Sequence, residues 1–199
     1  MEENKKRTVS GRWKLATVLL VCAAPLIASY VTYFGGFAKT MGRTNYGAIL
    51  DPRQHPMPPL SATTLDGAPA SLEAYRGKWL MLRSGPGACD DACHKQLFAM
   101  RQLRLMQGKE MDRVERVWLV TDREPLDTIV LREYDTMRIL RVDPAALAKW
   151  LPVEANEPAA EHIYMVDPLG NLMMRFPKDP DPAKVKKDIA RLLKASGIG

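Results

Sequence analysis

The sequence predicts an α/β sandwich with one N-terminal transmembrane helix, and three observations lead to this fold class. An uncharged apolar run occupies residues 15–34. After it, short strand-like runs alternate with segments of helical periodicity, which is the pattern of a sheet covered by helices. Two cysteines, Cys89 and Cys93, follow a strand-like run and a glycine-rich bend, at the point where a helix is expected to begin.

The N-terminal run LATVLLVCAAPLIASYVTYF contains twenty residues without a formal charge. A helix of that length spans the ~30 Å hydrocarbon core of a bilayer. Residues 1–14 carry five basic and two acidic side chains, so the positive-inside rule predicts a cytoplasmic N-terminus. The domain that follows is then expected outside the cytoplasm, in a bacterial periplasm. A cleaved signal peptide is the alternative, but the run is long for one and no small-x-small site closes it.

Residues 35–59 are polar, contain glycine and proline, and are expected to form a linker between membrane and domain. Residues 60–199 have a normal length for a single domain with its own core. The net charge is +6, and residues 1–14 contribute half of it. No basic stripe interleaved with aromatic residues occurs in the rest of the chain, so the charge indicates membrane topology and nucleic acid is not an expected partner.

The first half of the domain is expected to contain two strands and a helix after a hairpin. The hairpin covers residues 60–72, with Asp66-Gly67 at its turn. Residues 79–82 have the length and apolar character of a buried strand, and VERVWLV at 114–120 predicts the next one. Helical periodicity predicts a helix over residues 91–107. The apolar stripe of this helix consists of Leu97, Met100, Leu103 and Met106.

The second half is expected to contain three helices and a hairpin. Residues 126–134 have helical character. Asp143-Pro144 combines a favourable N-cap with proline at the first helical position, and Asp181-Pro182 repeats this signal for the last helix. Residues 163–166 and 172–176 are apolar runs separated by the turn sequence Asp-Pro-Leu-Gly-Asn, which predicts an antiparallel pair.

Cys89 and Cys93 are the main candidates for chemistry. Residues four apart share one face of a helix, so the two sulfurs converge on each other or on one atom. The helix start favours thiolate, the form that exchanges disulfides and binds soft metals such as Cu(I). A purely structural disulfide, or two unrelated buried cysteines, is the alternative. Cys22 is the only other cysteine and lies in the apolar N-terminal run.

Asp90 and Asp91 lie between the two cysteines, in the expected first turn of the helix. They complement the positive end of the helix dipole. Their negative charge also disfavours a thiolate nearby, which suits a reductant or a metal holder better than a strong oxidant.

Three segments resemble the SCO/SenC family of cytochrome oxidase copper-assembly proteins, which have a thioredoxin-like fold. They are Gly77–Leu82 followed by the Cys-x-x-x-Cys motif, Val120-Thr121-Asp122, and Tyr164–Gly170. The resemblance spans residues 60–193. It implies a redox-active Cys89–Cys93 pair, a copper ion held by these cysteines and one histidine, and a part in assembling the copper centre of cytochrome c oxidase. The copper-bearing oxidase subunit would then be the partner.

The histidine of this family falls at Ala159 in this chain, and His162 lies closer to Asp167 at the strand end. A shift within an extended segment changes the face on which a side chain lies. A shorter preceding loop would still bring His162 to the thiols, so His162 is either the third copper ligand or a structural histidine. His55 and His94 are interpreted as solvated residues.

Three functions remain open from the sequence. The first is a membrane-anchored, SCO-like copper-binding and thiol–disulfide factor for cytochrome c oxidase assembly. The second is a membrane-tethered thiol–disulfide oxidoreductase for other exported thiol proteins, and the third is a non-catalytic thioredoxin-like assembly protein. Any enzymatic activity is therefore expected to be thiol–disulfide exchange at most.

Overall fold

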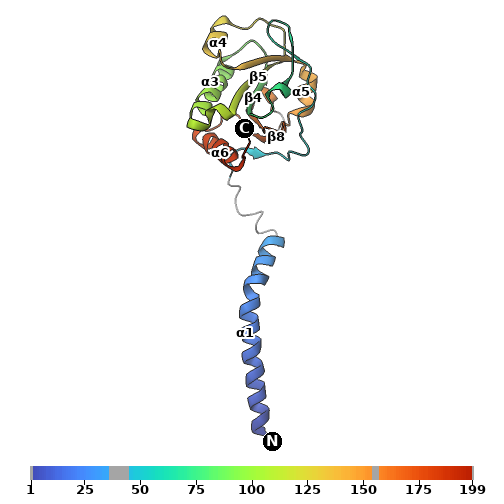
Figure 1. The fold of residues 1–199 in the computed structure, drawn as a ribbon, viewed down its shortest axis with the longest axis vertical. Coiled ribbons are helices and arrows are strands. Elements are labelled where there is room, and N and C mark those ends of the chain that lie inside the picture. The colour runs from blue at the N-terminus through green and yellow to red at the C-terminus, as the bar shows by residue number, and fades with distance from the viewer. Residues whose placement is uncertain (1, 36–44, 154–156, 199) are drawn as a thin grey trace. The chain divides into compact units, whose positions relative to one another are not determined.

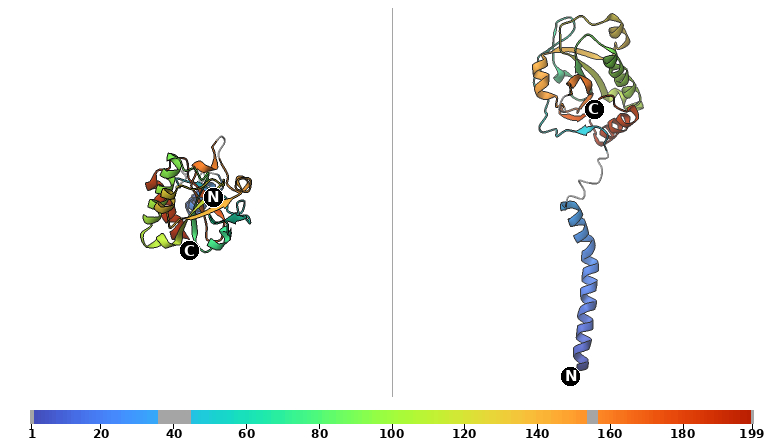
Figure 2. Two further views of the ribbon diagram at one scale, coloured as in Figure 1. Left: turned by 90° about the horizontal axis from the view of Figure 1, so that it is seen from above. Right: turned by 180° about the vertical axis from the view of Figure 1, so that it is seen from behind.

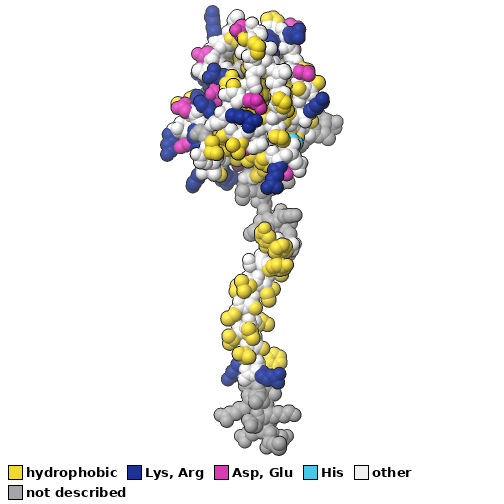
Figure 3. All heavy atoms as spheres, turned by 45° about the vertical axis from the view of Figure 1, so that its right-hand side comes forward, with side chains coloured by type: hydrophobic (Ala, Val, Ile, Leu, Met, Phe, Trp, Pro, Cys, Tyr) yellow, Lys and Arg dark blue, Asp and Glu magenta, His cyan; other side chains and the backbone are white. Residues whose placement is uncertain are grey.

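The computed structural model describes residues 2–35, 45–153 and 157–198. The chain divides into two compact units, residues 1–44 and 45–199. The first unit contains helix α1 (Glu2–Phe34), whose segment Gly11–Phe34 is long and apolar enough to cross a membrane. Hydrophobic side chains lie along this helix, with basic side chains near its N-terminal part (Figure 3). The expected span at residues 15–34 lies within this segment.

The second unit is built on a mixed eight-stranded sheet in the order β1-β8-β7-β4-β5-β6-β2-β3 (Figure 1). The central strands β4, β5 and β6 are parallel, and β7 and β8 join β4 in antiparallel orientation. The strands are β1 (Ala48–Ile49), β2 (Ala62–Thr63), β3 (Pro69–Ala70), β4 (Trp79–Gly85), β5 (Val114–Val120), β6 (Arg138–Val142), β7 (Tyr164–Val166) and β8 (Leu172–Arg175).

Helices cover both faces of this sheet (Figures 1 and 2). One face packs on α3 and α6 through a cluster that includes Met81, Met100 and Ile189. The other packs on α5 through a cluster that includes Leu80 and Trp150. The helices are α3 (Asp91–Leu105), α4 (Thr128–Glu133), α5 (Pro144–Trp150) and α6 (Pro182–Ala195), and the 3₁₀ helices are η1 (Leu72–Tyr75), η2 (Gly108–Arg113) and η3 (Ala159–Glu161). The thioredoxin-like sandwich predicted from the sequence is confirmed.

An aspartate caps each of the helices α3, α4, α5 and α6. The side chains of these residues accept hydrogen bonds from backbone N–H groups in the first turn, which would otherwise lack partners. The four caps are Asp90, Asp127, Asp143 and Asp181. The two Asp-Pro pairs therefore mark the starts of α5 and α6 as predicted, with the aspartate as N-cap and the proline in the first turn.

Two regions differ from the expectation. Strand β6 was not predicted. Residues 45–59, expected to belong to the linker, instead pack on the domain: Ala48–Ile49 pair with β8, and Met57 is buried. The carboxylate of Asp188 on α6 is buried and accepts hydrogen bonds from the backbone N–H groups of Tyr46 and Gly47. The remaining part of the expected linker, residues 36–44, lies outside the described residues.

Candidate dithiol site

The loop that carries the first cysteine is fixed by its backbone. It leaves β4 at Gly85, and the N–H of Gly87 lies 3.1 and 3.0 Å from the two carboxylate oxygens of Asp122, just beyond β5. A Cβ atom at Gly87 would lie 2.9 Å from the Leu126 side chain and 3.0 Å from the Asp122 carboxylate, so a larger residue would displace these side chains. Arg141 on β6 donates a hydrogen bond to the backbone oxygen of Asp122 at 2.6 Å. The loop is thus attached to the carboxyl ends of two neighbouring strands.

The structure brings Cys89 and Cys93 together as a disulfide, with their Cα atoms 5.2 Å apart. Asp90 caps α3 by accepting a hydrogen bond from the N–H of Cys93, which places the second cysteine in the first helical turn. The two sulfur-bearing residues differ in access. Cys93 is only 5% exposed, whereas Cys89 is half-buried. A thiol from another protein therefore reaches Cys89 more readily than Cys93.

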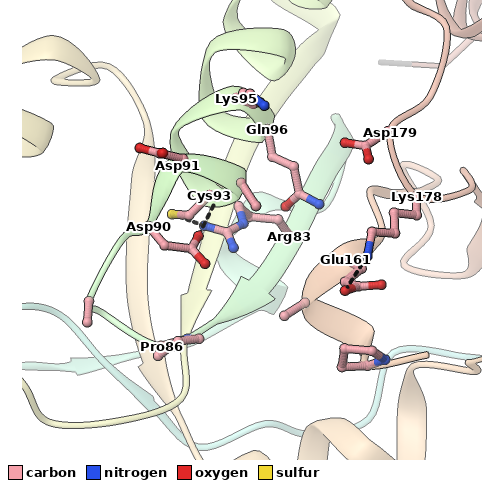
Figure 4. A pocket seen from close by; sticks show the side chains of 14 residues that line it. Arg83, Pro86, Asp90, Asp91, Cys93, Lys95, Gln96, Glu161, Lys178 and Asp179 are labelled. Carbon is pink, nitrogen blue, oxygen red and sulfur yellow. Dashed lines mark hydrogen bonds and ion pairs between the residues drawn. The ribbon is translucent and has the colours of Figure 1, made fainter. Parts of the chain in front are cut away.

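Arg83 on β4 is a candidate functional residue that the sequence analysis did not identify. The residue is 3% exposed, and its Nη1 donates a hydrogen bond to Sγ of Cys93 (Figure 4). The guanidinium also lies 5.3 Å from the ring centroid of Trp118. Burial lowers the pKa of Arg83 to about 10, with the charge of Asp90 acting in the opposite direction. Arg83 therefore remains a cation at neutral pH.

A signal for Arg83 was present in the sequence. The strand WLMLRSG is otherwise apolar or small, and a charged residue inside a buried strand needs a partner. Arg83 lies six residues before Cys89, close to the end of β4 from which the cysteine loop departs.

A cavity of about 670 Å³ lies beside Cys93. The loop after β4 and the first turns of α3 form one side of it, and the segment around η3 and the residues after β8 form the other. On the second side, Lys178 and Glu161 form an ion pair at 2.8 Å (Figure 4). The position at which the SCO/SenC resemblance places a histidine, Ala159, lies between the cavity-lining residues Pro158 and Ala160.

His162, the candidate third copper ligand, occupies a different environment. The residue is 1% exposed, and its Nδ1 lies 2.9 Å from the backbone oxygen of Phe176. Its Nε2 lies 3.0 Å from the carboxylate of Glu157, and it does not contribute to the cavity beside Cys93. His94 lies on α3, and His55 uses its backbone oxygen to accept a hydrogen bond from Leu172. None of the three imidazoles is joined to the cysteine pair by a contact within the described ranges.

These residues do not fit a copper centre made of two cysteines and a histidine. Across residues 2–35, 45–153 and 157–198, no group of three or more histidine, cysteine, aspartate or glutamate side chains is arranged to hold a metal ion. The guanidinium of Arg83 is a hydrogen-bond donor without acceptor capacity, and its charge has the same sign as that of a copper ion. The cation that donates a hydrogen bond to Cys93 Sγ therefore opposes a metal ion there.

Comparisons with known proteins agree on the fold. A family model described as a transmembrane-like, thioredoxin-like C-terminal domain matches residues 79–196. No curated protein matches the chain.

Solved structures of Sco proteins resemble the chain. Yeast Sco1 with copper bound is 19% identical with a TM-score of 0.54, and the match covers 71% of this chain and 90% of that one. A SCO1/SenC family lipoprotein from Bacillus anthracis is 19% identical with a TM-score of 0.54, covering 74% and 98%. BsSco, described through a disulfide switch, is 17% identical with a TM-score of 0.53, covering 73% and 95%. The predicted SCO/SenC resemblance is confirmed, as a likeness of fold.

Proposed function

We propose that this chain, which belongs to the family of transmembrane-like, thioredoxin-like C-terminal domains, is a membrane-anchored thiol–disulfide exchange factor. The observation that carries the proposal is the Cys89–Cys93 disulfide, which has one accessible sulfur and one buried sulfur in contact with a cation. An incoming thiolate attacks the accessible sulfur and the buried sulfur departs. This arrangement separates the two roles that thiol–disulfide exchange requires.

The size of the disulfide loop favours exchange over a structural role. The bond links residues four apart in sequence. Closing a loop of roughly five residues restricts the unfolded chain by only about 2 kcal/mol, against about 3 kcal/mol for a fifteen-residue loop. The domain also has an extensive core on both faces of its sheet, which holds the fold together without this bond.

The partner we propose is the copper-bearing subunit of cytochrome c oxidase. BsSco, which shares the fold, is a member of the Sco family of cytochrome c oxidase assembly proteins and has a disulfide switch. Cysteines must be reduced and deprotonated to bind a metal, so an assembling copper site needs control of its thiol state. The chain would act on those cysteines by exchange, since its own side chains do not fit a copper centre. Another exported protein with a reactive cysteine pair is the alternative partner.

The helix α1 would hold this activity at a membrane. Its apolar segment follows the basic residues of the first fourteen positions, and by the positive-inside rule this charge supports a domain that lies outside the cytoplasm. Disulfides persist in such compartments, whereas cytosolic thiols are kept reduced. The expected periplasmic location and the proposed redox chemistry are therefore compatible.

Thiol–disulfide exchange is tested with the full chain in detergent. The chain carries Cys22→Ser, so that only Cys89 and Cys93 react. The protein is equilibrated in glutathione buffers, and the reduced fraction is measured by thiol labelling and mass spectrometry. A short peptide with two cysteines serves as the model substrate. We expect a reversible two-electron equilibrium, and a mixed disulfide that accumulates with Cys93→Ser but not with Cys89→Ser. Failure of the pair to exchange, or loss of the fold on reduction, would refute the proposal.

Copper binding is tested on the same chain, reduced anaerobically and titrated with Cu(I) against a competing chelator. We expect the chelator to retain the metal, because Arg83 opposes a cation at Cys93. Stoichiometric binding that requires both cysteines would instead assign the chain to copper carriage.

A further inference from the structure

We propose that Arg83 is a positioning residue that holds Cys93 Sγ as the departing thiolate whenever the disulfide is opened. The inference rests on the proposed exchange function and deepens it by assigning a direction to the chemistry. It is carried by the contact between Nη1 of Arg83 and Sγ of Cys93, both of them buried.

The environment of Arg83 lacks a full counter-charge in the oxidised protein. A buried cation is costly unless it is paired and hydrogen-bonded. Asp90 lies close enough to influence Arg83 electrostatically, but its side-chain oxygen accepts the capping hydrogen bond from Cys93 N–H. Nε of Arg83 has no hydrogen-bond partner among the described residues. The guanidinium thus faces a neutral disulfide sulfur and retains unused donor capacity.

Opening the disulfide changes this balance. Breaking the bond converts the Cys93 sulfur from a neutral, weak acceptor into an anion in contact with Nη1. A charge-assisted hydrogen bond is roughly twice as strong as a neutral one, and the buried position strengthens it further. Arg83 therefore stabilises the reduced pair more than the oxidised pair. No proton has to reach Cys93 during the step.

A thiolate from a partner dithiol attacks Cys89 Sγ, a bond forms between these sulfurs, and the Cys89–Cys93 bond breaks with its electron pair on Cys93. The second thiolate of the partner then attacks its own first sulfur in the mixed disulfide and releases Cys89 as a thiolate. The partner dithiol becomes a disulfide by losing two electrons, and the Cys89–Cys93 pair gains them. In the reverse direction, the Cys89 thiolate first attacks the disulfide of the partner and forms the same mixed disulfide.

Because Arg83 favours the reduced form, it raises the reduction potential of the pair. The chain is then a better acceptor of electrons from thiols than the same fold without this arginine. Asp90 and Asp91 work in the opposite direction, and from them alone the sequence predicts a reductant or a metal holder. The buried cation in direct contact with the sulfur outweighs solvated carboxylates, whose charges water screens.

The test compares three variants of the full chain with Cys22→Ser. Arg83→Met removes the charge and keeps the length of the side chain, and Arg83→Lys keeps the charge without the planar donor group. The matched control is Arg116→Met, because Arg116 is equally buried at 3% exposure on the adjacent strand β5 and contacts Thr136 rather than a cysteine. The measurements are the glutathione equilibrium constant and the ultraviolet absorbance of the thiolate at fixed pH.

We expect Arg83→Met to lower the equilibrium constant for reduction by about tenfold or more, which corresponds to at least one pKa unit of lost charge interaction. Arg83→Lys should restore part of this loss, and Arg116→Met should lose stability without changing the constant. The thiolate absorbance should fall only in Arg83→Met. If Arg83→Met exchanges with the same constant as Arg116→Met, the assignment of Arg83 is wrong while the exchange function stands. If the parent chain does not exchange at all, the proposed function itself fails.

Discussion

Replacing His162 with alanine is predicted to destabilise the domain and to leave the chemistry of the cysteine pair unchanged. His162 is 1% exposed and its Nδ1 contacts the backbone oxygen of Phe176, directly after β8. The imidazole therefore ties the segment that precedes β7 to the segment that follows β8. A copper ligand of the Cys89–Cys93 pair would show the opposite behaviour, with a modest effect on stability and a large one at the thiols.

The magnitude follows from the contacts that are lost. The hydrogen bond to Phe176 contributes about 0.5–1.5 kcal/mol, and leaving that buried carbonyl without a partner costs about 1–3 kcal/mol. The variant should therefore lose roughly 2–4 kcal/mol of unfolding free energy. For a domain of this size, 1 kcal/mol corresponds to about 2–4 °C in Tm, so the melting temperature should fall by roughly 5–15 °C.

The assay combines urea denaturation with the glutathione equilibrium. His94→Ala serves as the control, because His94 is a half-buried histidine on α3 for which the structure gives no side-chain hydrogen bond among the described residues. We expect His162→Ala to shift the urea midpoint strongly and to retain the glutathione constant of the parent. A changed constant, or a Cu(I) affinity that His162→Ala abolishes while stability is retained, would show that this imidazole reaches the thiols.

Two further predictions follow from other parts of the chain. Asp188→Ala removes the acceptor of the Tyr46 and Gly47 N–H groups and should cost about 2–4 kcal/mol of unfolding free energy, with faster hydrogen exchange at those two amides and in β1. Hydrogen exchange that rises uniformly throughout the domain, without a local increase at these amides, would contradict the prediction for Asp188→Ala. A reporter active only in the cytoplasm, fused after Gly199, should remain inactive, because the positive-inside rule predicts a cytoplasmic N-terminus from the basic residues of positions 1–14. An active fusion would place the domain in the cytoplasm and remove the basis for a stable disulfide.

The fold could be predicted from local signals to a large extent. The Asp-Pro pairs at the starts of α5 and α6 and the apolar runs of β4 and β5 each have a local physical cause, and each predicted element is present. Strand β6 has the sequence Arg-Ile-Leu-Arg-Val. It was not predicted, because its two arginines interrupt the apolar run that would indicate a buried strand. In the structure Arg138 pairs with Glu115, and Arg141 donates to Asp122 and Glu124. These partners belong to a neighbouring strand and loop, and the spacing of residues within β6 does not indicate such contacts.

The residues before β2 could not be assigned to the domain for a related reason. Residues 45–59 lack helical or strand periodicity, so composition alone indicated a linker. Their attachment depends on β8 and on the buried Asp188, which are more than a hundred residues away in sequence. A single acidic residue on the apolar face of α6 is the only local sign of such a contact.

In the site as well, local features could be predicted from the sequence, whereas contacts between distant segments could not. The cysteine pair was identified because its spacing and its place at a helix start are local properties. The structure joins the two cysteines in a disulfide, and their redox activity stays a prediction. The environment of His162 was left open by the sequence, because it depends on how β7 and β8 align. Arg83 was missed because the depth of a side chain depends on sheet order, and β4 is covered by β5 and β7 on its two edges.

The charges around Cys93 determine what this version of the fold is able to hold. The N-terminus of α3 directs backbone N–H groups and the positive end of its dipole toward the cysteine loop, and Arg83 adds a full positive charge in contact with the sulfur. Both contributions favour an anion and oppose a cation. A metal centre needs its thiolates to be the dominant charges at the site, with neutral or anionic ligands completing the set. The side chains beside Cys93 meet the first requirement of thiol–disulfide exchange, a stabilised leaving thiolate, and fail the requirement of a metal centre. A residue that changes the sign of the local charge is therefore more informative about function here than the cysteine spacing, which both kinds of site share.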